Sequence, residues 1–216
     1  MFEGFSTKTG EFLWDLKFNN ERPWFLEHKG EFEKYVKEPF DELGNAVHDE
    51  MQRRFPEREW RLHISRIYRD ARRLYGRGPY KDHLWFTIWD GEPKDDNPAF
   101  WFEIGPSNFG YGAGFYAANP EQMEKYRAYI DANPAEIIRL DAELTERNQF
   151  VLAGEMYKKM KGDRGEVLNR WYNRRWLAFD YGNDHSEEIY VPEFVQTVSD
   201  GYEFLMPYYE LMRKFK

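Results

Sequence analysis

The sequence predicts an α+β fold: a single domain with a mainly antiparallel central sheet and helices at both chain ends packed on it. Near both ends, apolar residues recur at three- and four-residue steps, the spacing of one helix face. The middle of the chain holds adjacent short runs rich in aromatic residues, which is typical of strands. Because the connections between these runs are too short for helical crossovers, the strands should pair antiparallel. We expect residues 1–216 to form one globular domain.

The first predicted helix begins after Asn19 or Asn20, either of which can act as its N-cap, and it carries Pro23 in its first turn. Pro39 lies inside the same apolar pattern and should kink or split the helix, because proline removes a donor and clashes with the preceding turn. The apolar residues that define the pattern are Phe25, Phe32, Val36, Phe40, Leu43, Val47 and Met51.

Three strands are predicted in the middle of the chain. Residues 83–89 are apolar on both faces, as expected for a central strand, and residues 99–104 follow after a polar loop. Residues 109–118 alternate strictly, so that glycine occupies one face and lets another group approach the backbone closely. The residues of the other face are Phe109, Tyr111, Ala113, Phe115 and Ala117, opposite Gly110, Gly112 and Gly114.

Two copies of one helix start signal follow these strands. Asn119 and Asn133 each precede a proline, and Gln or Glu stands three residues after each asparagine. The signals predict helices over roughly 121–131 and 135–147.

Two short strands, at 176–181 and 188–191, and a C-terminal helix complete the predicted pattern. The apolar stripe of that helix lasts under three heptads and contains Pro207, which favours core packing over a dimeric coiled coil. The residues of the stripe are Val195, Val198, Tyr202, Leu205, Tyr209 and Met212.

The composition favours a globular protein with an aromatic core. The chain has a net charge of −8 and a mean hydropathy of −0.88, yet 19% of its residues are aromatic. Each buried ring removes on the order of 150–250 Å² from water, so these residues can build a sizeable core. The absence of cysteine excludes disulfides, thiolate nucleophiles and cysteine-ligated metals. Since the five histidines also lack zinc-site spacing, we expect neither a metal nor a cofactor.

The sequence also bears on cellular location. The first residues lack a basic segment followed by an apolar one, so we expect no signal peptide. The densest apolar run, Leu84 to Trp89, is far shorter than the ~20 residues that cross a bilayer. We therefore expect a cytoplasmic protein without a membrane partner.

Positive charge is concentrated in one stretch of an otherwise acidic chain. Between Arg53 and Lys81, ten basic residues stand against three acidic ones, and nine of the ten are arginines. Arginine presents a planar fork of donors that suits two-point contact with a carboxylate or a phosphate. The glycines and proline at 76–79 indicate a loop after about Arg73, in which cations can converge on one anion.

The leading hypothesis is a small anionic ligand, phosphate- or carboxylate-bearing, bound by this Arg-rich loop in an enzyme or a binding protein. No catalytic residue is assigned, because neighbouring guanidinium groups should keep the pKa of Asp70 low and we expect this carboxylate to orient an arginine. The segment from Asn20 to Trp24 offers amide and cationic groups, and we expect it to lie near the loop. The candidate ligand-binding residues are Asn20, Arg22, Arg66, Arg69, Asp70, Arg72, Arg77, Tyr80 and Lys81.

Two other interpretations stay open. The same Arg and Asp residues can form a structural salt-bridge network in a non-enzymatic module whose exposed rings bind a protein partner. Tyr68, Tyr75 and Tyr80, which stand among the arginines, would also suit single-stranded nucleic acid. The net charge of −8 disfavours that last partner.

Three motifs stand in order along the chain: Phe12-Leu13-x-x-Leu16-x-x-Asn19-Asn20-x-Arg22-x-Trp24-Phe25, Arg66-x-x-Arg69-Asp70-x-Arg72 with Pro79-Tyr80-Lys81, and Phe109-Gly110-Tyr111-Gly112-Ala113-Gly114-Phe115 with Asn119-Pro120. Together they resemble a widespread uncharacterised family, domain of unknown function 2461. The resemblance runs from about Phe5 to the last helix, at about 214, and it implies a single compact domain with no assigned activity. The family usually has Phe where this chain has Arg73.

Overall fold

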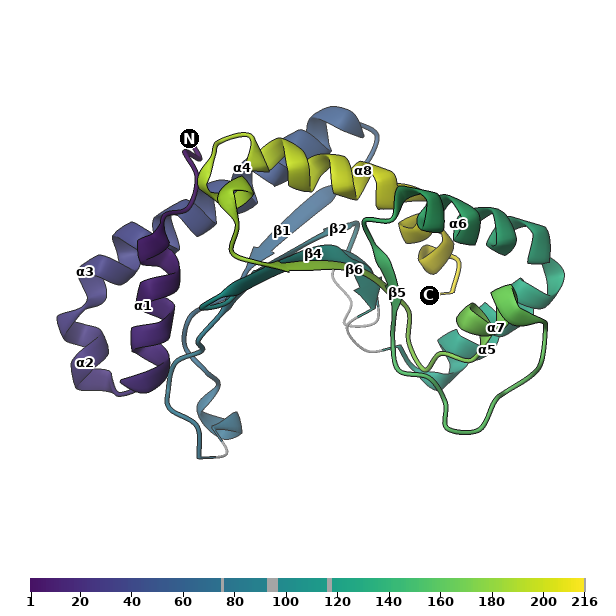
Figure 1. Cartoon of the computed structure of the whole chain (residues 1–216), viewed down its shortest axis with the longest axis horizontal. Coiled ribbons are helices and arrows are strands. Elements are labelled where there is room, and N and C mark those ends of the chain that lie inside the picture. Colours follow the sequence, from purple (N-terminus) through teal and green to yellow (C-terminus); the bar gives the residue numbers. More distant parts are fainter. Residues whose placement is uncertain (75, 93–96, 116–117, 216) are drawn as a thin grey trace. The chain divides into compact units, whose positions relative to one another are not determined.

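The computed structural model describes residues 1–74, 76–92, 97–115 and 118–215. The fold is α+β, with a six-stranded sheet in the order β1-β2-β3-β4-β6-β5 (Figure 1). The β1–β2 and β5–β6 pairs are antiparallel, which confirms the predicted class. The strands are β1 Trp60–Ile64, β2 Leu84–Asp90, β3 Pro98–Ile104, β4 Asn108–Phe115, β5 Val151–Ala153 and β6 Ala178–Asp184.

The residues fall into two compact units, which are described separately. Unit 1 comprises Met1–Gly91, Trp101–Gly110 and Gly182–Asp200, and unit 2 comprises Glu92–Phe100, Tyr111–Tyr181 and Gly201–Lys216. The single domain over residues 1–216 stays a prediction.

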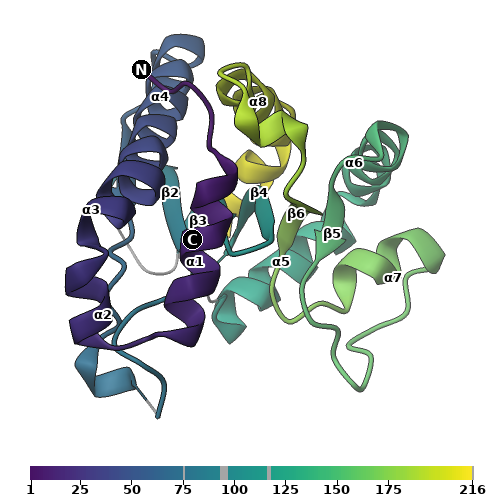
Figure 2. The same cartoon turned by 60° about the vertical axis from the view of Figure 1, so that its left-hand side comes forward.

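Unit 1 begins with a series of helices that Figure 2 shows from the side of the N-terminus. Pro39 lies in the first turn of α4, directly after the π-helical turn η1. The predicted long helix is therefore divided into separate helical segments just before the proline. The expected N-cap is wrong, because Glu21 rather than an asparagine precedes α2. The elements are α1 Thr7–Phe18, α2 Arg22–Glu27, α3 Lys29–Phe32, η1 Glu33–Lys37 and α4 Glu38–Arg54.

Helix α4 covers one face of β1 and β2. Phe40 of the helix lies 5.7 Å from Phe86 of β2, between ring centroids, and both side chains are fully buried. Gly44 permits this close packing, since a Cβ there would lie 3.2 Å from Ile64. The opposite face of the strand pair carries His63 and other polar or half-buried side chains, and this uncovered face borders the site described below.

Unit 2 contains α5 Pro120–Ala132, α6 Pro134–Arg147 and α7 Glu166–Tyr172, which contact one another, together with the β5–β6 pair. Its core is aromatic, as the composition predicts. The C-terminal helix α8, Phe194–Arg213, contributes buried residues to both units.

The glycine face of β4 serves strand packing at one position. A Cβ on Gly114 would lie 2.5 Å from the Cβ of Ala178 in β6, so only glycine allows this approach. The predicted inner-face residues Phe109, Tyr111, Ala113 and Phe115 are all buried, and Gly112 and Gly114 of the other face are buried as well. Ala117 lies outside the described residues.

Several elements differ from the predictions. The strand expected at 188–191 is instead the 3₁₀ helix η3, Glu187–Tyr190, and the carbonyl of Ile189 accepts the N–H of Phe5. Asn119 forms the predicted capping box with Gln122. Asn133 does not cap α6, because its side-chain amide donates to a carbonyl of the preceding helix. Helices α1 and α7 and strands β1 and β5 were not predicted.

No helix among the described residues is long and apolar enough to span a membrane.

Candidate functional site

The Arg-rich stretch forms an arm that extends from the ends of β1 and β2. We call residues 65–74 and 76–83 the arm, which includes the 3₁₀ helix η2, Ala71–Arg73; Tyr75 lies outside the described residues. Its two sides are held together as an antiparallel ribbon: Arg69 N donates to Pro79 O at 2.8 Å, and Lys81 N donates to Ile67 O at 2.7 Å. The sequence predicted a loop after about Arg73, whereas the chain leaves β1 already at Ile64.

The arm lies against α1 and α2, as both views show (Figures 1 and 2). The ring of Tyr80 is 2% exposed and stacks on Phe25, with ring centroids 4.1 Å apart. Asn20 uses both amide atoms on the backbone of Tyr80, accepting from its N–H and donating to its carbonyl, each at 2.9 Å. A Cβ on Gly78 would lie 2.2 Å from Oδ1 of Asn20, so glycine is required at this contact. Asn20 and Tyr80 therefore hold the arm in place.

Three basic residues of the arm form what we call the cationic cluster: Arg66, Arg69 and Lys81. Arg69 Nε donates to Tyr80 O at 2.7 Å, and Lys81 Nζ donates to the carbonyl of Arg66. The pKa of Lys81 is lowered by burial first and then by repulsion from Arg69 and Arg66. The charges therefore lie close enough to repel one another.

The members of the cationic cluster differ in their partners. The side chain of Arg69 is 16% exposed, and its Nη2 lies 3.5 Å from Oδ1 of Asp82. Arg66 is exposed, and no carboxylate of the described chain bonds to its guanidinium or to the Lys81 ammonium. Glu103 acts on Lys81 only through its charge, which opposes the lowering of the Lys81 pKa.

Asp82 is the acid at the base of the arm. Its carboxylate accepts from Arg69, lies 3.2 Å from Nδ1 of His83 and lies 4.0 Å from Nζ of Lys17. Burial acts to raise the pKa of Asp82, but hydrogen bonds from its own backbone N–H and from His83, with the charges of His83 and Arg69, lower it overall. Asp82 is thus an anchor for Arg69.

An indole ring borders the cationic cluster on the uncovered face of the sheet. Lys81 Nζ lies 5.7 Å from the ring centroid of Trp85, and the His63 ring lies 5.3 Å from the same indole. The cluster and the ring together form a cationic surface with one flat apolar wall, a combination suited to an anion that carries an organic group.

The other predicted residues lie around this cluster in different ways. Asp70 accepts from the backbone and guanidinium of Arg72, so it orients an arginine, and the Arg72 side chain is 87% exposed. Arg77 is exposed on the arm. Burial raises the pKa of Tyr80 and the charge of Arg22 opposes this, which places Arg22 near the phenol.

The predicted proximity of the two cation- and amide-rich segments is present. Asn20 and Arg69 donate to the same carbonyl, that of Tyr80, at 2.9 and 2.7 Å. The predicted set missed Asp82 and Trp85. The two-residue alternation of the strand after Leu84 could have placed Trp85 on the outer face, whereas the approach of Lys17 and Glu103 had no signal in the sequence.

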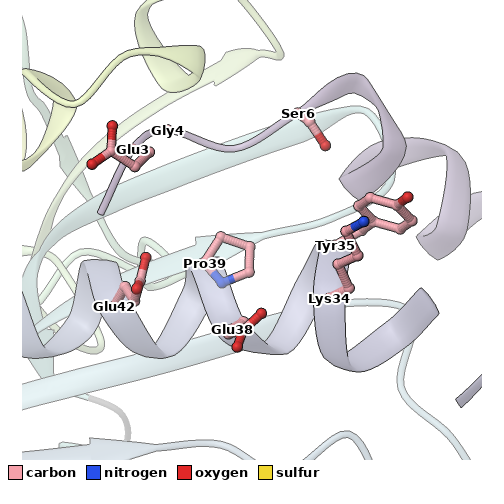
Figure 3. Close-up of a pocket in the computed structure, with 8 residues that line it drawn as sticks. All are labelled: Glu3, Gly4, Ser6, Lys34, Tyr35, Glu38, Pro39 and Glu42. Atoms are coloured by element: carbon pink, nitrogen blue, oxygen red, sulfur yellow. The ribbon is translucent and has the colours of Figure 1, made fainter. Parts of the chain in front are cut away.

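A shallow pocket of about 170 Å³ lies elsewhere in unit 1, between the N-terminal segment and the start of α4 (Figure 3). Glu3, Glu38 and Glu42 line it, opposed by Lys34, so its charge would repel an anion. Glu42 already accepts from the amino group of Met1 at 2.9 Å. We assign this pocket no role.

The described residues contain no group of three or more His, Cys, Asp or Glu side chains that could hold a metal ion.

Comparison with known proteins gives a family without an activity. No curated protein matches the chain. The model of one family, described as conserved hypothetical protein (DUF2461), matches residues 8–211, a span that includes the arm, its helical support and the glycine-rich strand. The chain therefore belongs to the DUF2461 family of conserved hypothetical proteins.

Proposed function

We propose that the protein is cytoplasmic and binds a small anionic ligand, phosphate- or carboxylate-bearing, at the cationic cluster of the arm. One observation carries the proposal: Arg66 is exposed beside the half-buried Lys81, and no carboxylate of the described chain bonds to either cation. Burial first, and then repulsion from Arg69 and Arg66, lowers the pKa of Lys81. An anion between Arg66 and Lys81 would offset that repulsion, so binding would be favoured electrostatically.

The contacts around the cationic cluster suggest a role for each of the other residues. Arg69 is fixed by Tyr80 O and Asp82, so it supplies charge at a set position. Asn20 and Tyr80 position the arm, and Trp85 offers a flat surface to the organic part of the ligand. Arg72 and Arg77 would attract the ligand electrostatically at long range without contacting it directly.

The experiment is a calorimetric titration with inorganic phosphate at constant ionic strength, using wild type and matched charge variants. Arg66→Gln should weaken binding by about tenfold or more, because one charge-assisted hydrogen bond contributes roughly 1.5–3 kcal/mol. Arg77→Gln changes the net charge equally, on the same arm, and should stay within about twofold of wild type. Equal affinities for the two variants would refute the proposal.

The rival function is a non-enzymatic interaction module in which the charges only hold the arm together. The Arg69–Asp82 and Arg72–Asp70 pairs favour it. Asp70 and Arg72 are exposed, however, and such surface pairs contribute at most about 1 kcal/mol. Under the rival, no variant of the cluster changes phosphate binding, while Arg69→Ala lowers the unfolding free energy because Asp82 loses its partner.

A further inference from the structure

A second group of arginine and tyrosine side chains lies in unit 2, at positions that the sequence analysis did not identify as candidates. It is built from Tyr126 and Arg127 of α5, Tyr157, and Arg174 just after α7, and we call these four residues the Tyr126 cluster. The Tyr126 hydroxyl and Nη1 of Arg127 are buried without a hydrogen-bond partner among the described residues, and Arg174 bonds there to backbone carbonyls rather than to a carboxylate.

The hydroxyl belongs to Tyr126, which is 1% exposed. Its ring packs edge-on against Phe215, with centroids 5.3 Å apart, and its oxygen is buried with no hydrogen-bond partner in the described structure. Burial raises the pKa of Tyr126, although the charges of Arg174 and Arg127 oppose the shift. The group is therefore a neutral O–H donor without an acceptor among the described residues, which is a costly state for a buried polar atom.

The first guanidinium belongs to Arg127, the next residue on α5. Its carbon lies 5.9 Å from the centroid of the Tyr157 ring, and its Nη1 is buried without a partner among the described residues. The ring face accounts for the position of the guanidinium plane but leaves its N–H donors unsatisfied.

The second guanidinium belongs to Arg174, and the backbone fixes its position. Met156 and Arg174 form an antiparallel bridge, and Tyr157 N donates to Asn173 O at 2.8 Å. Arg174 donates from Nη1 to Gly154 O at 2.6 Å and from Nε to Arg170 O at 2.8 Å. No carboxylate of the described chain bonds to it, and burial, with repulsion from Arg170, lowers its pKa.

Other arginines in the same unit do have carboxylate partners. Arg164 pairs with Asp131 at 2.5 Å, and Arg170 and Arg175 have carboxylates at 3.3 and 2.9 Å. Acidic residues are thus available in unit 2, yet the more buried Arg127 and Arg174 are left without one. Two half-buried guanidinium groups without a carboxylate partner in the described chain are unfavourable, and an external anion would stabilise both.

We propose that Arg127, Arg174 and the Tyr126 hydroxyl form an oxyanion-binding site that takes a phosphate or carboxylate group. Such a group accepts hydrogen bonds from all three donors and neutralises the two guanidinium charges. Lys161, whose Nζ lies 4.6 Å from the Tyr157 ring centroid, adds further positive charge at the same ring. The site lies in a different unit from the arm and is independent of the function proposed there.

The test follows the Arg127 and Arg174 Nε–Hε signals by NMR while inorganic phosphate, or citrate in a parallel titration, is added to the full chain. These two signals should shift together with one affinity, and the preferred anion identifies the ligand chemistry. Tyr126→Phe removes only the hydroxyl and should weaken that affinity by about tenfold, the effect of one charge-assisted hydrogen bond. Arg139→Gln removes one positive charge at an exposed arginine of the same unit and should leave the affinity within about twofold.

Two results separate this site from the arm and from a purely structural cluster. Arg66→Gln should leave the shifts of Arg127 and Arg174 unchanged, so the arm proposal can fail without affecting this one. In anion-free buffer, Tyr126→Phe should be at least as stable as wild type, because the lost hydroxyl has no hydrogen-bond partner in the described part of the chain. Unshifted signals with both anions, or shifts that Tyr126→Phe leaves intact, would overturn the proposal.

Discussion

Asp180 of β6 should lower the stability of this protein at neutral pH, and Asp180→Asn tests that inference. The neighbouring residue Phe179 points into the aromatic core, 4.6 Å from Tyr208 between ring centroids, so Asp180 lies on the opposite face of the strand. Its Oδ1 is buried without a hydrogen-bond partner in the described structure. Burial raises the pKa of Asp180 from 3.8 to about 6.

The magnitude and the sign follow from proton linkage. The folded state binds the proton more tightly than the unfolded state, so stability falls as pH rises from about 4 to about 6 and is level above that range. A shift of about two units, at about 1.36 kcal/mol each, corresponds to roughly 3 kcal/mol. We reduce this to about 2 kcal/mol, because Asp180 is only partly buried and water screens its charge.

The assay is urea unfolding monitored by tryptophan fluorescence at pH 4, 5, 6 and 7.5. The advantage in unfolding free energy of Asp180→Asn over wild type should grow by about 2 kcal/mol between pH 4 and pH 7.5. If the advantage of Asp180→Asn does not change with pH, the carboxyl is not desolvated and the reasoning is refuted.

Two further predictions concern local structure. Gly78→Ala would place a Cβ 2.2 Å from Oδ1 of Asn20, so the arm must shift. We expect the unfolding free energy, measured by urea titration, to fall by about 2–3 kcal/mol and the amide of Tyr80 to exchange faster. An unchanged exchange rate at Tyr80 would contradict the contact. Asn119→Ala removes the capping box with Gln122 and should cost about 1 kcal/mol in the same titration, with a cost near zero arguing against the cap.

The sequence predicted which residue types make up the candidate site, but not how their side chains are arranged. The charge imbalance between Arg53 and Lys81 identified the arm, and the breaker residues at 76–79 predicted that it is irregular. The sequence could not say which arginines find carboxylates. Arg69 bonds to Asp82, thirteen residues away, whereas Arg66 does not bond to a carboxylate in the described structure, because the ribbon pairing orients each side chain separately.

Asn20 lies near the arm as predicted, but its role differs from the predicted contact with a ligand. Its position near the arm was expected, but both of its amide atoms are used by the Tyr80 backbone, so it positions the arm and does not face a ligand. The Tyr126 cluster was missed altogether, since Arg127 and Arg174 are isolated in the sequence and both act on Tyr126 only in the folded chain.

The amino-acid sequence alone determined the class of fold, the split at Pro39, the capped start of α5 and the inner face of β4, because each depends on residues a few positions apart. Only the tertiary structure decided which charges are paired, which carboxyl is desolvated and which hydroxyl is left without a partner. Those properties depend on the dielectric surroundings and on neighbours far along the chain, and local spacing carries no information about either.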